Sequence, residues 1–313
     1  MGAASLGSRA IIGTFYETLR LADGLGWQGK IATLFNSNQE SETYKWLGMS
    51  PTMREWIGQR LLRGLKDNGL SIINKTFEST LEVFVDDLRR DKTDQIRLRI
   101  KEMADRTSSH WASLISTLIN SNGTAYDGVN FFANTHSEGD SGTLKNALTS
   151  TEYTVLDVAT AASPTPSEMA DALMAVIGHF YTFKDDVGEP FNELSTNFLV
   201  MVPVNLWGAT VNAVSAKLLN TGSGARDNPL NAMGINIDVV VNPRLTSTTK
   251  FFVFRTDGRV GAFIKQEEVP VKVSAVAEGS EEEFKHNRHL YGVTAVRNVG
   301  FGMWQHAIQA TLS

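Results

Sequence analysis

The 313-residue sequence contains no cysteine, no apolar run of membrane-spanning length and no run of lysine or arginine. The lack of cysteine excludes disulfides, thiolate zinc sites and cysteine nucleophiles. No stretch approaches the roughly 20 apolar residues of a membrane helix, and the N-terminus lacks the hydrophobic region of a secretory signal. A formal net charge of -5 argues against tight binding to a phosphate backbone. We therefore expect a protein that is made and folded in a cytosol and has no membrane partner.

Signals for nucleotide chemistry are weak. The stretch "GLGWQGKI" places Gly24, Gly29 and Lys30 at the spacing of a phosphate-binding loop. Ile31 stands where such a loop needs a magnesium-binding Ser or Thr, and no hydrophobic strand precedes the stretch. A pliable, glycine-rich arm is the simpler interpretation.

Two further pairs of polar residues are candidates for chemistry. His286 and His289 follow a run of glutamates, and on a helix they would share a metal ion, but a solvated charged loop is favoured because the segment leads into a strand. Asp127 and His136 would form an acid/base pair, but no nucleophile accompanies them and Asp-Gly is first of all a turn signal. We predict no catalytic residue, no metal site, no cofactor and no enzymatic activity.

Helical periodicity is clearest between Ile96 and Leu118, where apolar residues recur every three or four positions. A second helix is expected at "TPSE", because Thr165 and Glu168 have the spacing of a capping box. A third should follow "FLVMVP", with an inward stripe that is formed by Leu206, Thr210, Val211, Val214 and Leu218.

Strand signals are equally definite. "LSIINKTFESTLEVFVD", residues 70–86, alternates so that Ile73, Phe77 and Leu81 share one face, and Asn68-Gly69 is a turn signal. An extended two-stranded hairpin is therefore expected over residues 52–86. Four β-rich runs follow residue 234, and the C-terminal segment predicts two strands that join near Gly300 and Gly302. With neither a repeated βαβ period nor an internal repeat, the expected fold class is α+β.

The polar segment "TYKWLGMSPTMREWIGQR", residues 43–60, contains two of the six tryptophans in the chain, Trp46 and Trp56. A long two-stranded hairpin is marginal in water on its own and needs a surface to lie on. A segment that cannot bury its aromatic residues against itself is expected to bury them against another copy of the chain.

The order of arm, hairpin and long helix resembles the tailed-phage major capsid proteins of the Hong Kong 97-type fold. Five segments are similar to the major head subunits of phage Mu and of Mu-like prophages: "NSNQESETYKWLGMSPTMREWIGQR", "GLSIINKTFESTLEVFVDDL", "YDGVNFFANTH", "LVMVPVNLWGAT" and "YGVTAVRNVGFGMWQHAI". The similarity runs through nearly the whole chain and is densest from Asn36 to Phe84.

The resemblance implies a division of the chain. Residues 1–50 would be an N-terminal arm, 51–91 an extended β-hairpin loop, 92–165 a peripheral domain with its spine helix, 166–285 an axial domain, and 286–313 return strands of the peripheral domain. The extended loop would lie across a neighbouring subunit. Its candidate inter-subunit contact residues are Trp46, Arg54, Trp56, Arg60, Lys66, Asp67, Asn68 and Phe77.

The resemblance also implies partners and a location. The chain would assemble into pentamers and hexamers of an icosahedral virion shell that encloses double-stranded DNA without sequence-specific binding. A portal protein is expected. There is little room for an N-terminal scaffolding segment, so a separate scaffolding protein is expected unless a leader has been removed. Some shells of this fold contain lysine–asparagine cross-links, but no catalytic glutamate stands in a matching motif here, and we predict none.

Two alternatives remain open. An encapsulin-like nanocompartment shell shares the fold and would hold cargo enzymes. An α+β enzyme or ligand-binding protein would instead form a defined monomer or dimer with a deep pocket and converging polar groups.

Overall fold

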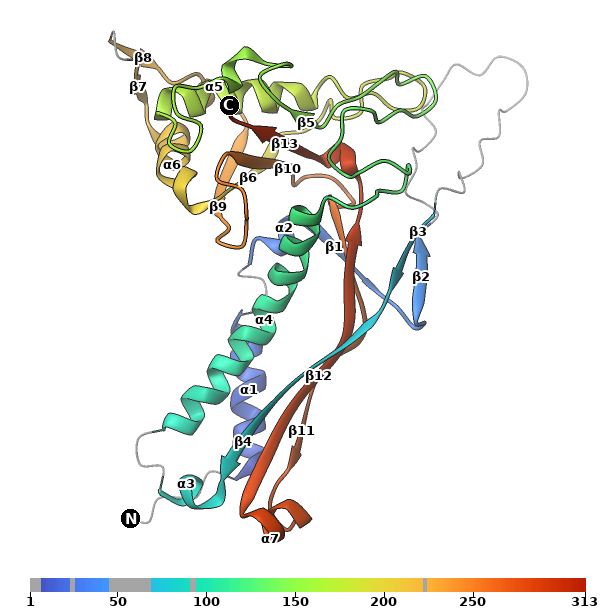
Figure 1. Ribbon diagram of the computed structural model, residues 1–313, viewed down its shortest axis with the longest axis vertical. Coiled ribbons are helices and arrows are strands. Elements are labelled where there is room, and N and C mark those ends of the chain that lie inside the picture. The colour runs from blue at the N-terminus through green and yellow to red at the C-terminus, as the bar shows by residue number, and fades with distance from the viewer. Residues whose placement is uncertain (1–6, 23–25, 45–68, 91–93, 222–223) are drawn as a thin grey trace, which may run out of the picture.

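A computed structural model describes residues 7–22, 26–44, 69–90, 94–221 and 224–313. Figure 1 shows a broad upper part, which holds the C-terminus, above a long, narrow lower part. Among the described helices, none combines the length and the apolar character needed to cross a membrane. The two parts are built on different sheets, and two long strands run from one part into the other.

The upper part is a five-stranded mixed sheet in the order β5-β13-β10-β6-β9. Its strands are β5 (Ala147–Leu148), β6 (Asn197–Val202), β9 (Asn236–Val241), β10 (Lys250–Arg255) and β13 (Ala307–Thr311). The middle strands are hydrophobic on both faces, as buried strands are, and helices α5 (Pro166–Phe180) and α6 (Trp207–Ser215) contribute to the same core. Short elements complete this part: β7 (Leu218–Asn220), β8 (Ala225–Asp227), η1 (Thr154–Leu156), η2 (Val204–Leu206), η3 (Pro229–Ala232) and η4 (Trp304–His306).

The lower part is a four-stranded sheet in the order β1-β11-β12-β4, with two helices packed on one face. Its strands are β1 (Ala32–Asn36), β4 (Lys75–Phe84), β11 (Phe263–Val276) and β12 (Arg288–Phe301). The packed helices are α1 (Ser8–Ala22) and the 27-residue α4 (Gln95–Ser121). The smaller elements are α2 (Gln28–Ile31), α3 (Val85–Arg90), α7 (Glu281–His286), β2 (Ser41–Tyr44) and β3 (Leu70–Ile73).

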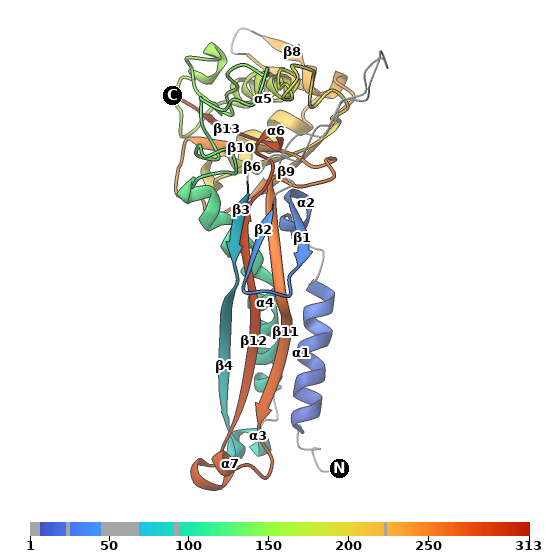
Figure 2. The ribbon, with the colours of Figure 1, turned by 90° about the vertical axis from the view of Figure 1, so that its right-hand side faces the viewer.

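Strand β12 joins the two parts because it contributes to both cores. Tyr291 and Val293 pack with α1 and α4 in the lower core, whereas Val299 and Phe301 belong to the upper core. Figure 2 shows β4 along one side of this sheet and α7 at its lower end. Because β12 is packed into the cores of both parts, it fixes their position relative to each other.

Several sequence predictions are confirmed. The long helix is α4, the Thr165–Glu168 capping box is present with both reciprocal hydrogen bonds, and the C-terminal segment forms β12 and β13. Between those strands the chain passes so close to Gly261 that a Cβ on Gly302 would lie 2.6 Å from the Gly261 carbonyl oxygen. The last two β-rich runs form one strand, β11, which continues through Pro270 by shifts in its register against β12.

The expected strand over residues 70–86 differs from the structure in its faces. Ile72 is buried and Ile73 is 58% exposed, so the prediction that Ile73 shares an inward face with Phe77 is wrong. The phase changes at Asn74, whose side chain turns inward and accepts a 2.8 Å hydrogen bond from Gln266 Nε2. One residue outside the alternation moves every later side chain of the strand to the opposite face of the sheet. β3 pairs with β2, and β4 pairs with β12.

The expected inward stripe of α6 is also partly wrong. Leu206 and Thr210 are buried, but Val211 is 38% exposed and Leu218 is 60% exposed. The helix ends at Ser215, so Leu218 lies in β7 rather than on the helix.

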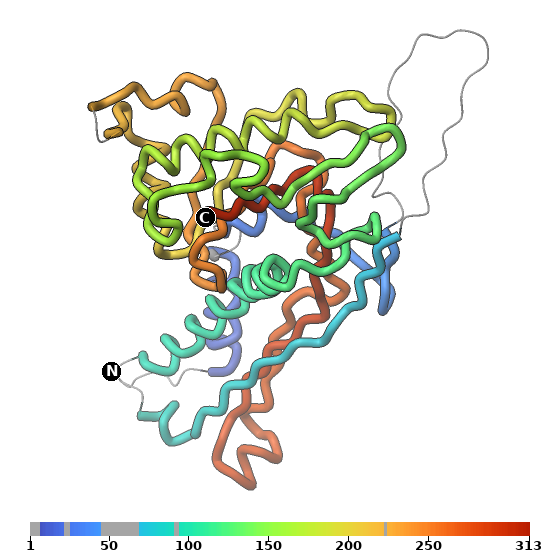
Figure 3. Tube along the Cα trace, turned by 45° about the horizontal axis from the view of Figure 1, so that its top comes forward, coloured from blue at the N-terminus to red at the C-terminus, as the bar shows by residue number. Residues whose placement is uncertain are grey.

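The structure contains an internal repeat that the sequence analysis missed. The backbone bonds within residues 123–131, which follow α4, recur within residues 183–191, which follow α5, with every partner shifted by 60 positions. Both turns contain a glycine with positive φ, Gly128 and Gly188. The second turn packs against the loop that follows the first one, through the Asp140 amide and the Asp186 carbonyl (2.9 Å), and Figure 3 shows these green and yellow-green loops side by side. Residues 123–131 and 183–191 have too few identical residues for the repeat to be recognised from the sequence.

Candidate functional site

The base of the predicted extended loop is firmly held. Tyr44 stands opposite Leu70 in the β2–β3 ribbon, and its hydroxyl donates a 2.8 Å hydrogen bond to buried Gln266 on β11. Burial, and then the nearby Glu42, raise the pKa of Tyr44 to about 12. Most predicted contact residues lie between these two strands, outside the described residues: Trp46, Arg54, Trp56, Arg60, Lys66, Asp67 and Asn68.

Phe77 is the one predicted contact residue that the structure describes. It lies on β4, with its ring 4.4 Å from that of His110 on α4 in an edge-to-face contact. Both rings line a groove of about 370 Å³ between β4 and α4. Phe77 thus has a partner within its own chain, and its contact with a neighbouring subunit stays a prediction.

A buried arginine holds α4 against the sheet beneath this groove. Arg297 on β12 is 3% exposed, and its guanidinium lies 4.5 Å from the centre of the Trp111 ring. It donates from Nε to His110 Nδ1 (3.2 Å) and from a terminal nitrogen to the Thr107 carbonyl (3.0 Å). Burial lowers the pKa of Arg297, and its nearest carboxylate, on Glu267, lies 3.9 Å away. The Arg297 guanidinium is therefore held mainly by its contacts with α4, and less by the salt bridge with Glu267.

The position of His110 fixes its charge. Because Nδ1 accepts from Arg297, the ring is neutral with its proton on Nε2. Burial, and then the charges of Arg297 and Arg244, lower the pKa of His110 to about 4. His110 therefore stays neutral at every pH above about 5.

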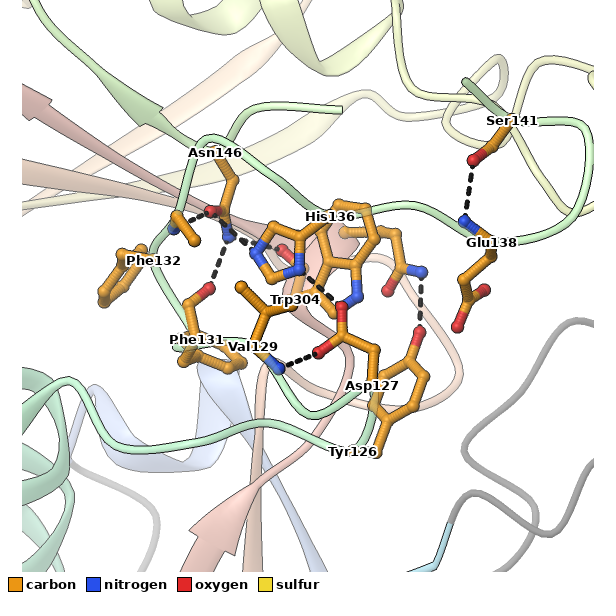
Figure 4. A network of polar contacts seen from close by, with 12 residues as sticks. Tyr126, Asp127, Val129, Phe131, Phe132, His136, Glu138, Ser141, Asn146 and Trp304 are labelled. Atoms are coloured by element: carbon orange, nitrogen blue, oxygen red, sulfur yellow. Dashed lines mark hydrogen bonds and ion pairs between the residues drawn. The ribbon is translucent and has the colours of Figure 1, made fainter. Parts of the chain in front are cut away.

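The structure brings Asp127 and His136 together, as Figure 4 shows. His136 Nδ1 lies 2.5 Å from the Asp127 carboxylate, and Nε2 lies 3.2 Å from the side-chain oxygen of Asn146. The ring stacks on Trp304 with centroids 4.0 Å apart. His136 is fully buried and the Asp127 side chain is 5% exposed, so no substrate reaches the pair. It ties the turn that follows α4 to the C-terminal segment.

We predict that Asp127→Asn lowers the free energy of unfolding by about 2 kcal/mol. The substitution replaces the carboxylate that lies 2.5 Å from His136 Nδ1 in a buried site. Urea unfolding of the wild type and of the variant measures the loss. An unchanged stability would contradict a structural role for the pair.

Two of the other residues that were candidates for a binding or metal site, Lys30 and His289, are held in structural contacts. Lys30 Nζ lies 2.7 Å from an Asp238 carboxylate oxygen, and Ile31 is buried. His289 is 3% exposed with Nε2 3.4 Å from Glu283, whereas His286 is exposed at the end of α7. Within the described ranges, no three His, Asp or Glu side chains gather as metal ligands.

A buried histidine gives the fold an acid sensitivity. His306 is 5% exposed and donates from Nδ1 to the Val260 carbonyl (2.8 Å). Burial, and then Arg255, lower the pKa of His306 to about 4 from an ordinary value of 6.5. The unfolded chain therefore binds more protons at His306 between pH 6.5 and 4. This contribution to stability is complete above pH 6.5 and is lost as the pH falls towards 4.

We expect His306 to account for about 3 kcal/mol of the loss of unfolding free energy between pH 7 and pH 4. Urea unfolding of the wild type and of His306→Gln at several pH values measures this loss. The variant should be less stable at pH 7 and should show a shallower dependence on pH. Equal slopes for the two proteins would show that His306 is not the titrating group.

Two exposed apolar features were missed by the sequence analysis. Val204, Trp207 and Val211 form a stripe along η2 and α6, exposed by 60%, 49% and 38%. Their spacing of three and four residues was a visible signal, but it predicts a buried face as readily as an exposed one. Phe284 on α7 is 92% exposed at the far end of the lower part. A group of exposed apolar side chains such as the stripe on η2 and α6 is typical of a contact surface.

Comparisons with known proteins identify relatives of this chain. The family model described as Mu-like prophage major head subunit gpT matches residues 13–165 and 225–312. The major capsid protein of Escherichia phage Mu is 37% identical over 118 residues, which are 37% of this chain and 39% of the phage protein. The Mu-like prophage FluMu major head subunit of Haemophilus influenzae is 31% identical over 112 residues, or 35% of this chain and 36% of that protein. The chain thus spans less than half the length of each of these curated relatives.

The fold has solved counterparts. A chain from the procapsid of bacteriophage JBD30 is similar with a TM-score of 0.55 and 21% identity, over 97% of this chain and 75% of that chain. The expected Hong Kong 97-type α+β capsid fold is confirmed by this likeness and by the observed mixture of helices and sheets. The family match covers most of the sequence and both parts of the structure. The chain therefore belongs to the family of Mu-like prophage major head subunits.

Proposed function

We propose that this chain is the major capsid subunit of a phage head, which assembles with copies of itself into a closed icosahedral shell around double-stranded DNA. The observation that carries the proposal is the family match over residues 13–165 and 225–312. The capsid fold over nearly the whole chain supports it, as do exposed apolar side chains that the isolated subunit leaves uncovered. Shell subunits need such surfaces because heterologous contacts must close around a rotation axis.

The roles of the segments are part of the proposal. Residues 1–50 act as the N-terminal arm and 51–91 as the extended loop, of which the stretch before β3 lies over a neighbour while β4 pairs with β12 of its own subunit. Residues 92–165 and 286–313 form the peripheral domain, in which α4 is the spine, and 166–285 form the axial domain at five-fold and six-fold centres. The sheets cross these bounds, because β11 and α7 lie in the lower part with β12, and β5 and β13 lie in the upper sheet. The anchoring of the β2–β3 ribbon supports the second role, because it holds both ends of residues 45–69 at one place on the subunit.

The proposed partners follow from a head shell. The subunits form pentamers and hexamers, and a portal and a separate scaffolding protein take part in assembly. The enclosed DNA is held without sequence-specific contacts, which the formal net charge of -5 favours because like charges repel. We propose synthesis in the cytoplasm of a bacterial host and a final place in the virion.

Electron microscopy of the purified chain, alone and co-expressed with its candidate scaffolding protein, tests the proposed function. Closed icosahedral particles, tubes or rings of five and six subunits are expected. Sedimentation at rising protein concentration is the matching solution measurement, and it should show a sharp onset of large particles. A monomer or small oligomer that persists under both conditions would contradict the proposal.

A further inference from the structure

The lower tip of the subunit presents one phenylalanine to solvent. Phe284 lies in α7 and is 92% exposed, the largest value among the large apolar side chains of the described residues. Glu281, Glu282 and Glu283 fill the first turn of this short helix, and Lys285 in its last turn pairs with Glu281. Arg288 pairs with both Glu282 and Glu82, which fixes the tip to β4. We call the exposed Phe284 side chain the knob. It stands on α7, which has three glutamates and is fixed to β4.

The groove between β4 and α4 has the complementary character. Its floor includes the apolar side chains of Phe77, Leu81 and Met103. Three arginines and two glutamates line it, but Arg99 pairs with Glu102 (3.1 Å) and Arg297 is buried, so the excess of positive charge is small. The remaining charged lining residues are Arg106 and Glu78. At about 370 Å³ it falls in the range of sites that accept a small apolar group. β4 is also the edge strand of its sheet, so no further strand of the described residues covers this side.

The knob and the groove of one subunit cannot meet. Both belong to the same sheet, in which Ser79 of the groove stands opposite Val293, five residues along β12 from Arg288 at the tip. Five residues of strand span about 17 Å. The intervening strands are paired without a break, so the sheet cannot fold back on itself. Phe284 can therefore enter this groove only on another molecule.

We propose that Phe284 of one subunit inserts into the groove between β4 and α4 of a neighbouring subunit. The glutamates beside Phe284 then face Arg106 at the rim, and Arg99 stays paired with Glu102. The contact joins two different surfaces, so it is heterologous and leaves each subunit with a free knob or a free groove for the next one. This inference rests on the proposed function and names one contact that the shell would use.

Cysteine cross-linking tests the contact directly, because the chain has no cysteine of its own. In a Ser79→Cys/Lys285→Cys double variant, one thiol lies at the groove and one beside the knob. Assembled particles treated with a short bismaleimide should give a ladder of dimers, trimers and larger species on a denaturing gel. The matched control, Thr294→Cys/Lys285→Cys, places the first thiol at an exposed position outside the groove lining and should give no ladder.

A second measurement uses assembly itself. Phe284→Ala should raise the protein concentration needed for assembly about tenfold, with unchanged thermal unfolding of the free subunit. Leu98→Ala, at an exposed position on α4 outside the groove lining, should leave assembly unchanged. Particles that assemble normally with Phe284→Ala and give no ladder with the cysteine pair would overturn this inference and leave the proposed function standing. If no variant and no parent chain forms particles, the proposed function fails, and this inference with it.

Discussion

Replacement of residues 46–67 by a four-residue Gly-Ser turn is expected to abolish closed shells and to leave the stability of the free subunit nearly unchanged. Tyr44 and Leu70 stand opposite each other in the β2–β3 ribbon, so a short turn closes the ribbon without moving either strand. The ribbon stays anchored through the Tyr44 hydroxyl and through Asn74, which donates to the Gln39 carbonyl at 2.8 Å. Electron microscopy measures the first effect and urea unfolding the second.

The control is a variant in which residues 46–67 are kept in number and composition but scrambled in order. This variant should also fail to close shells, because the contacts with a neighbour depend on which residue stands where. Normal shells from the short-turn variant would contradict the role proposed for this segment. A large loss of subunit stability would show instead that the segment belongs to the core of its own chain.

Arg297→Ala is expected to lower the free energy of unfolding by about 3 kcal/mol. The substitution removes the cation stacked on Trp111 and the donors to His110 and to the Thr107 carbonyl, and it leaves these half-buried partners without their contacts. It also removes the larger of the two charges that depress the His110 pKa, so that value should rise from about 4 towards 6.5. Chemical unfolding and an NMR titration of His110 measure the two effects.

Arg297→Lys is the control that separates charge from geometry. Lysine keeps the positive charge but lacks the planar group that stacks on Trp111 while donating to two partners. We expect an intermediate loss of stability and a His110 pKa that stays low. A His110 pKa that does not move in Arg297→Ala would show that burial alone sets it.

The helices were the most predictable part of this fold. α4 follows from apolar residues every three or four positions, and α5 from the Thr165–Glu168 pair, because these signals are local. The faces of residues 70–86 were not predictable beyond Asn74. That residue turns inward because Gln266, 192 positions away, donates to it, and no local pattern contains that partner.

The candidate site was predictable only in part. The tryptophans of residues 43–60 suggested a contact surface, but the groove is formed by β4, α4 and β12, which are distant in the sequence. Asp127 and His136 were recognised as a pair, yet their burial under Trp304 removes them from chemistry, and burial comes from tertiary packing. The buried position of Arg297 was missed because nothing beside it in the sequence indicates Trp111 or His110 as its neighbours.

A reconstruction of the assembled particle by electron cryo-microscopy tests the account most directly. It should show the chain between Tyr44 and Leu70 lying across an adjacent subunit, with Trp46 and Trp56 in contact with that neighbour. A map in which this stretch folds back onto its own subunit and touches no other copy would contradict the account.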